Sequence, residues 1–199
     1  LPPDNTANTI TIQSPHTVTV TASVSADQLT VNSGGQLVVN VGQTLTIVDG
    51  TGTDLALNGT ATVNGALTVS AAAALVAANT LTNNGTTTIN GTFQIDQGGF
   101  GAGTTDFTYG PVSALVINYT QAGVYGPVDA GHRYFPTTGV RNLTLQQTGT
   151  GAYQMGKTCS IAGTLTIQGA GTKSFDLQSF GFTADTTAVS ANLTMLGAS

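Results

Sequence analysis

Residues 60–95 read TATVNGALTVSAAAALVAANTLTNNGTTTINGTFQI. A short unit recurs in this stretch: an apolar residue, a small residue and a second apolar residue, as in Leu67-Thr68-Val69. Residues i and i+2 of a β-strand share a face, so the two apolar side chains of each unit point one way and the central residue points the other. The pattern therefore predicts a series of very short strands, each with one buried face.

Ten such units occupy the first hundred residues, and they begin only six to ten residues apart. Between them lie Asn-Gly and Asp-Gly pairs, which tolerate positive φ and turn the chain sharply; they begin at Asp49, Asn58, Asn64, Asn84 and Asn90. An antiparallel sandwich has strands of about 5–6 residues with turn signals every 8–12, and the many steps of six residues are too short for it. The repeat therefore predicts an all-β parallel β-helix (β-solenoid) of about 18–24 residues per coil.

The composition changes near residue 99. Eleven of the twelve aromatic residues follow that point, the exception being Phe93, and the strand units become more widely spaced. We expect residues 1–99 to form a regular β-solenoid and residues 100–199 to continue it. This second part is expected to be wider, with longer loops and most of the aromatic residues.

The charge content excludes several classes of protein. Only 7% of the residues are charged, all nine acidic residues are Asp, and the net charge is −5 with a sequence pI of about 4.4. A coiled coil needs charged side chains on its exposed faces, and nucleic-acid binding needs a basic face. A membrane-spanning helix needs about 20 apolar residues in succession, whereas the longest apolar run here is residues 71–78.

Few residues are arranged for catalysis. Polysaccharide lyases and hydrolases built on parallel β-helices need clustered carboxylates, and only Asp49 and Asp54, in DGTGTD, are close in sequence. These two are a weak candidate for a metal site, and two turn-forming Asp residues are the simpler interpretation. Common nucleophile, phosphate-binding and zinc motifs are absent from the sequence. We therefore expect no enzymatic activity and no cofactor.

The longest irregular stretch, residues 121–140, carries the densest group of polar residues. It contains Tyr125, Asp129, His132, Arg133 and Tyr134. Long loops are frequent sites of function, so these residues are candidates for binding a glycan or contacting a neighbouring subunit. The alternative is a loop held in place by its own polar contacts.

Several runs resemble the β-solenoid repeats of large secreted, adhesin-like surface proteins of Bacteroidetes and related bacteria. They are TITIQSPHTVTVTASVSADQLTVNSGGQLVV, TLTIVDGTGTDLALNGTATVNGALTV and LTNNGTTTINGTFQIDQGGF, followed by LVINY, RNLTLQQ and SIAGTLTIQ. The resemblance covers roughly residues 9–170 and implies an exported protein, outside the cell or on its surface. It implies no catalytic residues. The C-terminal sorting domain of such proteins is absent from the sequence, so we expect a segment or a processed subunit.

The distribution of charge favours self-association. Residues 1–132 contain seven Asp and no cation, whereas residues 133–199 contain four cations and two Asp, giving −7 and +2. A solenoid also has two open ends that natural solenoids cap, and the sequence offers no evident cap. We therefore expect an extracellular filament subunit or adhesin stalk whose copies meet head-to-tail.

Two binding functions are the alternatives to this structural role. Thr-x-Thr pairs at 9/11, 17/19/21, 44/46, 80/82 and 164/166 raise the possibility of ice binding, although they do not recur at one fixed spacing. Surface glycans are the other possible partner. Nucleic-acid binding and membrane insertion are not expected.

Overall fold

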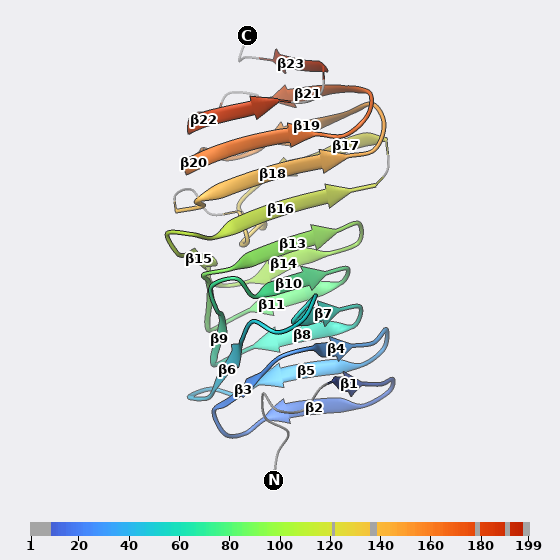
Figure 1. The fold of residues 1–199 in the computed structure, drawn as a ribbon, viewed down its shortest axis with the longest axis vertical. Coiled ribbons are helices and arrows are strands. Elements are labelled where there is room, and N and C mark those ends of the chain that lie inside the picture. The colour runs from blue at the N-terminus through green and yellow to red at the C-terminus, as the bar shows by residue number, and fades with distance from the viewer. Residues whose placement is uncertain (1–8, 121, 136–138, 178–179, 190–191, 197–199) are drawn as a thin grey trace.

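The computed structural model describes residues 9–120, 122–135, 139–177, 180–189 and 192–196. Its strands stack along one axis as a rod, with β1 near one end and β23 at the other (Figure 1). No described residue lies in a helix, and every strand pair is parallel. The predicted parallel β-solenoid is therefore confirmed.

One sheet, sheet A, runs the whole length of the rod. Its nine strands, in order, are β1 (Ile10–Ile12), β4 (Leu29–Val31), β7 (Leu55–Leu57), β10 (Ala74–Ala77), β13 (Thr92–Asp96), β16 (Ala114–Tyr119), β18 (Asn142–Gln147), β20 (Cys159–Gln168) and β22 (Phe182–Val189).

The first five coils have three sides. Sheet B contains β2 (Thr17–Val20), β5 (Gln36–Val39), β8 (Thr60–Val63), β11 (Thr80–Asn83) and β14 (Phe100–Gly103). Sheet C contains β3 (Val24–Ala26), β6 (Thr44–Ile47), β9 (Ala66–Val69), β12 (Thr86–Ile89) and β15 (Thr108–Tyr109).

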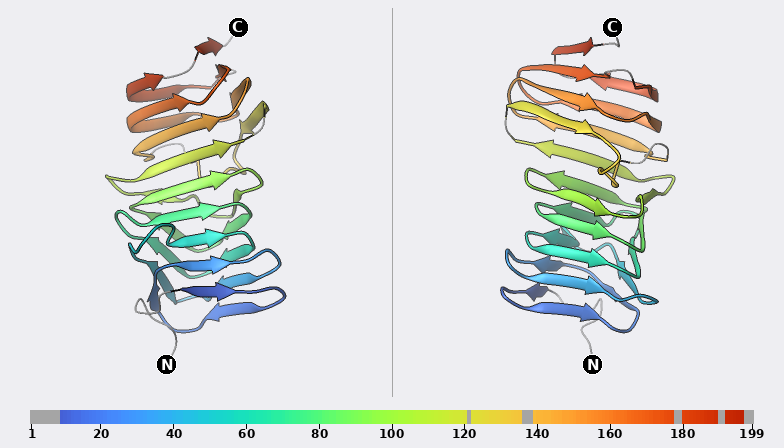
Figure 2. Two further views of the ribbon diagram at one scale, coloured as in Figure 1. Left: turned by 45° about the vertical axis from the view of Figure 1, so that its right-hand side comes forward. Right: turned by 180° about the vertical axis from the view of Figure 1, so that it is seen from behind.

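The later coils have two sides. Sheet D, which faces sheet A there, contains β17 (Gly123–Val128), β19 (Gly151–Met155), β21 (Thr172–Asp176) and β23 (Asn192–Leu196). Sheets B and D both lie behind sheet A in the view of Figure 1, as the rear view in Figure 2 shows. The change from three sides to two falls between β15 and β16. The division at residues 99 and 100 remains a prediction.

The register explains how unequal repeats build a regular core. Leu29, Leu55, Leu75, Phe93 and Leu115 occupy one inward column of sheet A. The column continues through Leu143 and Leu165. Successive members lie 18 to 28 residues apart, and the extra residues are accommodated outside the ladder. Two coils are longer than predicted: one carries the DGTGTD turn and the other the loop after β17.

The glycines of the Asn-Gly pairs are needed for a different reason from the one predicted. Gly59, Gly65 and Gly85 do not have positive φ. A Cβ added to Gly85 would instead clash with the backbone carbonyl oxygen of Gly65, one coil away. The amide of Gly85 also donates a 2.9 Å hydrogen bond to the carbonyl of Val63. Glycine is therefore required at these corners because the coils approach closely.

Candidate functional site

The first described coil exposes part of the apolar core. Val18 on β2 and Leu37 on β5 are neighbours in one inward column, yet the exposed fraction falls from 46% at Val18 to 3% at Leu37. Val24 on β3 is likewise only partly buried, whereas its register partner Leu45 on β6 is buried. The first described coil therefore leaves the end of the hydrophobic core accessible.

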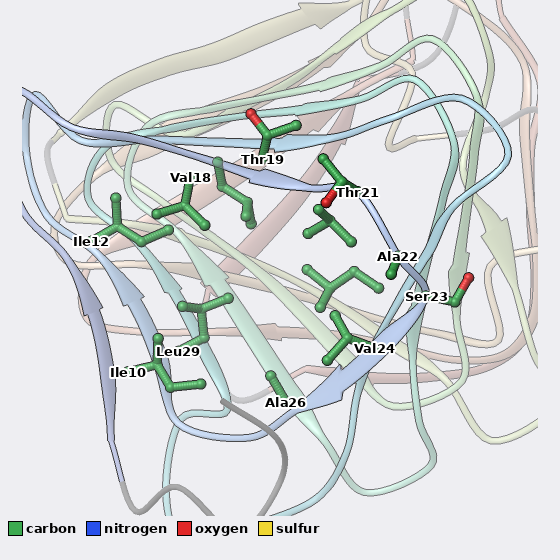
Figure 3. Close-up of a pocket in the computed structure, with 13 residues that line it drawn as sticks. Ile10, Ile12, Val18, Thr19, Thr21, Ala22, Ser23, Val24, Ala26 and Leu29 are labelled. Carbon is green, nitrogen blue, oxygen red and sulfur yellow. The ribbon is translucent and has the colours of Figure 1, made fainter. Parts of the chain in front are cut away.

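This end contains a cavity of about 240 Å³. Figure 3 looks into it: the side chains of Ile12, Val18 and Val24 point into the enclosed space, and the hydroxyls of Thr19 and Ser23 lie at its rim. All three sheets contribute, through β1, β2 and β3. A cavity with this lining suits an apolar side chain or ring, because a polar group placed there would find few partners.

A second candidate site lies where the solenoid changes from three sides to two. The junction loop, residues 129–135, follows β17 and returns to the last strands of sheets B and C. The Arg133 amide donates to the Gly101 carbonyl at 3.2 Å, and the Arg133 carbonyl accepts from the Phe107 amide at 3.0 Å. The loop therefore supplies backbone hydrogen bonds to β14 and to the segment that leads into β15.

Tyr134 is the centre of this junction. Its ring is fully buried, with edge-to-face contacts to Phe93 and Phe100 at centroid distances of 6.2 and 5.8 Å. It packs so closely on Gly101 that no Cβ would fit there. The Tyr134 side chain therefore fills the interior where sheets B and C end, and its role in binding or subunit contact stays a prediction.

The tyrosine hydroxyls form a buried network. The Tyr109 hydroxyl donates to the Tyr134 carbonyl at 2.6 Å, and the hydroxyls of Tyr125 and Tyr134 are in contact. Burial raises the pKa of Tyr125 to about 12, and it raises the pKa of Tyr134 and of Tyr109 well above the usual value. These side chains therefore stay protonated and act as hydrogen-bonding and packing groups.

The charged residues of the junction loop contact one another and nearby strands. Asp129 Oδ1 lies 2.9 Å from His132 Nδ1, and that contact holds the pKa of the Asp129 carboxyl below its usual value. Arg133 forms a 3.3 Å ion pair with Asp106, and the Lys157 ammonium donates to the His132 carbonyl at 2.9 Å. Asp106 and Lys157 were not singled out from the sequence, because 20 or more residues separate them from the loop.

Asp49 and Asp54 differ in their surroundings. Asp54 is buried, and its two carboxylate oxygens accept 2.7 Å hydrogen bonds from the amides of Gly50 and Ala74. Asp49 is exposed. Among the described residues, no three His, Cys, Asp or Glu side chains are grouped so as to hold a metal ion. Asp54 therefore fixes the long DGTGTD turn against the next coil.

Comparisons with known protein families, curated proteins and solved structures found no match to this chain. No helix among the described residues is long and apolar enough to cross a membrane.

Proposed function

We propose that the chain is a structural rod of an extracellular assembly: a subunit of a self-associating filament or a stalk segment of a surface adhesin. Its partners are other copies of itself, arranged head-to-tail. Export and a surface location rest on the sequence resemblance described above and on the charge-poor, Thr-rich surface.

The observation that carries this proposal is the stacking of parallel strands along one axis around a single core, part of which is accessible at the first described coil. Contiguous exposed apolar surface is uncommon on monomeric proteins and often marks an interaction site. Because the core is one continuous cluster of buried side chains from Ile12 to Phe175, covering its end with another copy would extend the same packing. The first part of the chain is negative and the last part positive, which favours attraction between unlike parts of two copies.

Sedimentation velocity across a protein concentration series tests the proposal, with electron microscopy of the concentrated sample. We expect the mean mass to rise with concentration and elongated particles to lengthen along the rod axis. A protein that sediments as a monomer at every concentration, with no elongated assemblies in the images, contradicts self-association. An association that weakens at high salt would support the contribution of charge.

Ice binding is the second candidate, because the structure aligns hydroxyls that the sequence spacing left scattered. Ser25, Thr46, Thr68, Thr88 and Thr108 are register partners in successive strands of sheet C. Each of them alternates with inward-facing neighbours along the chain, which places it outward, and successive members lie about 4.8 Å apart. Thermal hysteresis tests this candidate: Thr68→Lys should abolish it, whereas Thr62→Lys on sheet B should not. No hysteresis in the unmodified protein rejects it.

A further inference from the structure

We propose that Asn90 is a site of spontaneous covalent modification in the folded protein, at which the side-chain amide is converted to aspartate or isoaspartate. The reaction consumes only water and needs no enzyme, and it is independent of the proposed self-association. The proposal rests on a difference between the four Asn-Gly pairs of the chain, which begin at Asn58, Asn64, Asn84 and Asn90.

An Asn-Gly pair carries its own nucleophile. The backbone nitrogen of the glycine attacks Cγ of the asparagine side chain, so that an N–Cγ bond forms and the Cγ–Nδ2 bond breaks. The proton of the glycine amide leaves with Nδ2 as ammonia, and water then opens the succinimide ring at either carbonyl to give aspartate or isoaspartate. Glycine favours this reaction because it has no Cβ to hinder the attack and its backbone is conformationally free.

In three of the pairs the attacking nitrogen is held by a hydrogen bond. Each glycine amide donates to a valine carbonyl of the preceding coil, in the pairs Gly59–Val31 (2.8 Å), Gly65–Val39 (3.1 Å) and Gly85–Val63 (2.9 Å). Attack on Cγ requires that this bond breaks and that the nitrogen turns toward the asparagine side chain. The corner hydrogen bonds therefore slow the reaction at Asn58, Asn64 and Asn84.

The fourth pair lacks this restraint. The amide of Asn90 donates to the Val69 carbonyl at 2.8 Å, as the asparagine amides of the other three pairs donate to their valine carbonyls. Within the described part of the chain, however, the Gly91 amide has no acceptor, and Gly91 is joined to the next coil through its carbonyl, which accepts from the Ala114 amide at 3.0 Å. The Gly91 nitrogen can therefore reach Cγ of Asn90 without the loss of a hydrogen bond.

Solvent exposure alone would rank the four sites differently. Asn58 and Asn84 are exposed, whereas Asn64 and Asn90 are half-buried. If access of water decided the rate, the two exposed residues would react first. The freedom of the glycine amide instead selects Asn90, so the two explanations can be separated within one chain.

The position of Asn90 gives the modification a structural consequence. Asn90 lies in the corner between β12 and β13, and its Oδ1 lies so close to Gly110 of the next coil that a Cβ there would approach it to 2.3 Å. Isoaspartate lengthens the main chain at this corner by a methylene group, immediately before β13. That strand carries Phe93, whose ring contacts Tyr134. Modification of Asn90 should therefore weaken the junction between the three-sided and two-sided parts.

Peptide mass mapping of the whole 199-residue chain, incubated in mildly alkaline buffer, measures the conversion at each of the four sites. Released ammonia gives the total, and enzymatic methylation of isoaspartate identifies that product. In the folded protein we expect Asn90 to convert about tenfold faster than the other three, as expected when one hydrogen bond must first be broken. In concentrated urea the four sites should convert at similar rates, because each is then a free Asn-Gly pair.

Asn90→Gln removes the site, since the longer side chain forms the corresponding ring far less readily, and Asn58→Gln is the matched control at another Asn-Gly corner. Far-UV circular dichroism establishes that both variants are folded. After incubation, the unmodified protein and Asn58→Gln should unfold at a lower urea concentration than before, whereas Asn90→Gln should not change. If Asn90→Gln fails to fold, the mass mapping of the unmodified protein is sufficient to decide the proposal.

Three results of the mapping would overturn the assignment. Faster conversion of Asn58 and Asn84 than of Asn90 in the folded protein would mean that exposure controls the reaction. Equal rates at all four sites in the folded protein would mean that the corner hydrogen bonds give no protection. Conversion of all four sites in urea but of none in the folded protein would mean that the fold protects Asn90 as well.

Discussion

Replacing Tyr134 with alanine should destabilise the protein strongly, because this ring closes the three-sided part of the solenoid. The side chain is fully buried and packs on Phe93, Phe100 and Gly101. Truncation of a large buried aromatic side chain costs about 3–5 kcal/mol. For a chain of this length each kcal/mol lowers the melting temperature by about 2–4 °C, so we expect a decrease of about 6–20 °C.

The sequence supplies a convenient probe for this experiment. The chain contains no Trp and only five Tyr, and ring contacts or hydrogen bonds connect all five: Tyr109, Tyr119, Tyr125, Tyr134 and Tyr153. Tyrosine fluorescence therefore reports the junction, whereas far-UV circular dichroism reports all the strands. Urea titrations followed by both signals measure the free energy of unfolding and show whether the junction opens before the rest.

Tyr134→Phe is the matched control. It keeps the ring and removes only the hydroxyl, whose contact is with Tyr125. A hydrogen bond of this kind contributes about 0.5–1.5 kcal/mol, so this variant should lie close to the unmodified protein. A loss of less than about 1 kcal/mol for Tyr134→Ala would refute the assignment of the ring as a core element, since the cavity left behind must then have collapsed or never been filled.

Three further predictions follow from other parts of the structure. Gly85→Ala should lower the free energy of unfolding measured in urea by more than Gly42→Ala does. A Cβ at Gly85 would clash with the backbone of the previous coil, whereas a Cβ at Gly42 would meet no neighbouring atom and would be disfavoured only by the positive φ of that residue. The Cys159 thiol, whose pKa burial raises to about 12, should react with a thiol reagent at pH 8 only after urea is added; fast labelling of the native protein would contradict this. Alkaline titration should show stability lost as pH rises from about 10 toward 12, because Tyr125 and Tyr153 have pKa values raised by burial and their protonated forms favour the folded state; tyrosinate absorbance that develops fully well before circular dichroism is lost would contradict it.

The short strand units of the first hundred residues were enough to predict the solenoid, because the period-2 pattern identifies the buried side of each strand without any alignment. Leu29, Leu55 and Leu75 lie in one column, as that pattern requires. The sequence did not reveal how many sides a coil has, since this depends on how three or two successive strands close around the core. Register was equally hidden, because coils of 18 and 28 residues align only once their turns are known.

The candidate site was only partly accessible to sequence reasoning. Asp129, His132 and Arg133 are close together in the sequence, but their partners Asp106 and Lys157 come from elsewhere in the chain. Tyr134 lies inward because the loop turns back on the preceding coils, and no local pattern encodes that return.

Lys173 marks a different limit of the sequence pattern. A lysine is ordinarily expected to face water, yet Lys173 occupies an inward position on β21 and is buried. Its ammonium donates to the carbonyls of Gly149 and Ala170, and burial lowers its pKa. The long aliphatic stem packs in the core while the charged end reaches a turn, which a binary pattern of apolar and polar residues does not anticipate.

The junction is the point at which the continuity of the rod depends most on side chains. Sheet A alone passes unbroken from the three-sided to the two-sided part, through the pairing of β13 with β16, and sheets B and C end there. Backbone hydrogen bonds along one side would leave the other two sides free to open under axial load. The Tyr134 ring, the amide and carbonyl of Arg133 and the Arg133–Asp106 ion pair connect those sides to the junction loop. Two of the chain's four cations, Arg133 and Lys157, lie at this junction. This is the arrangement expected if the few charges serve to hold the rod together.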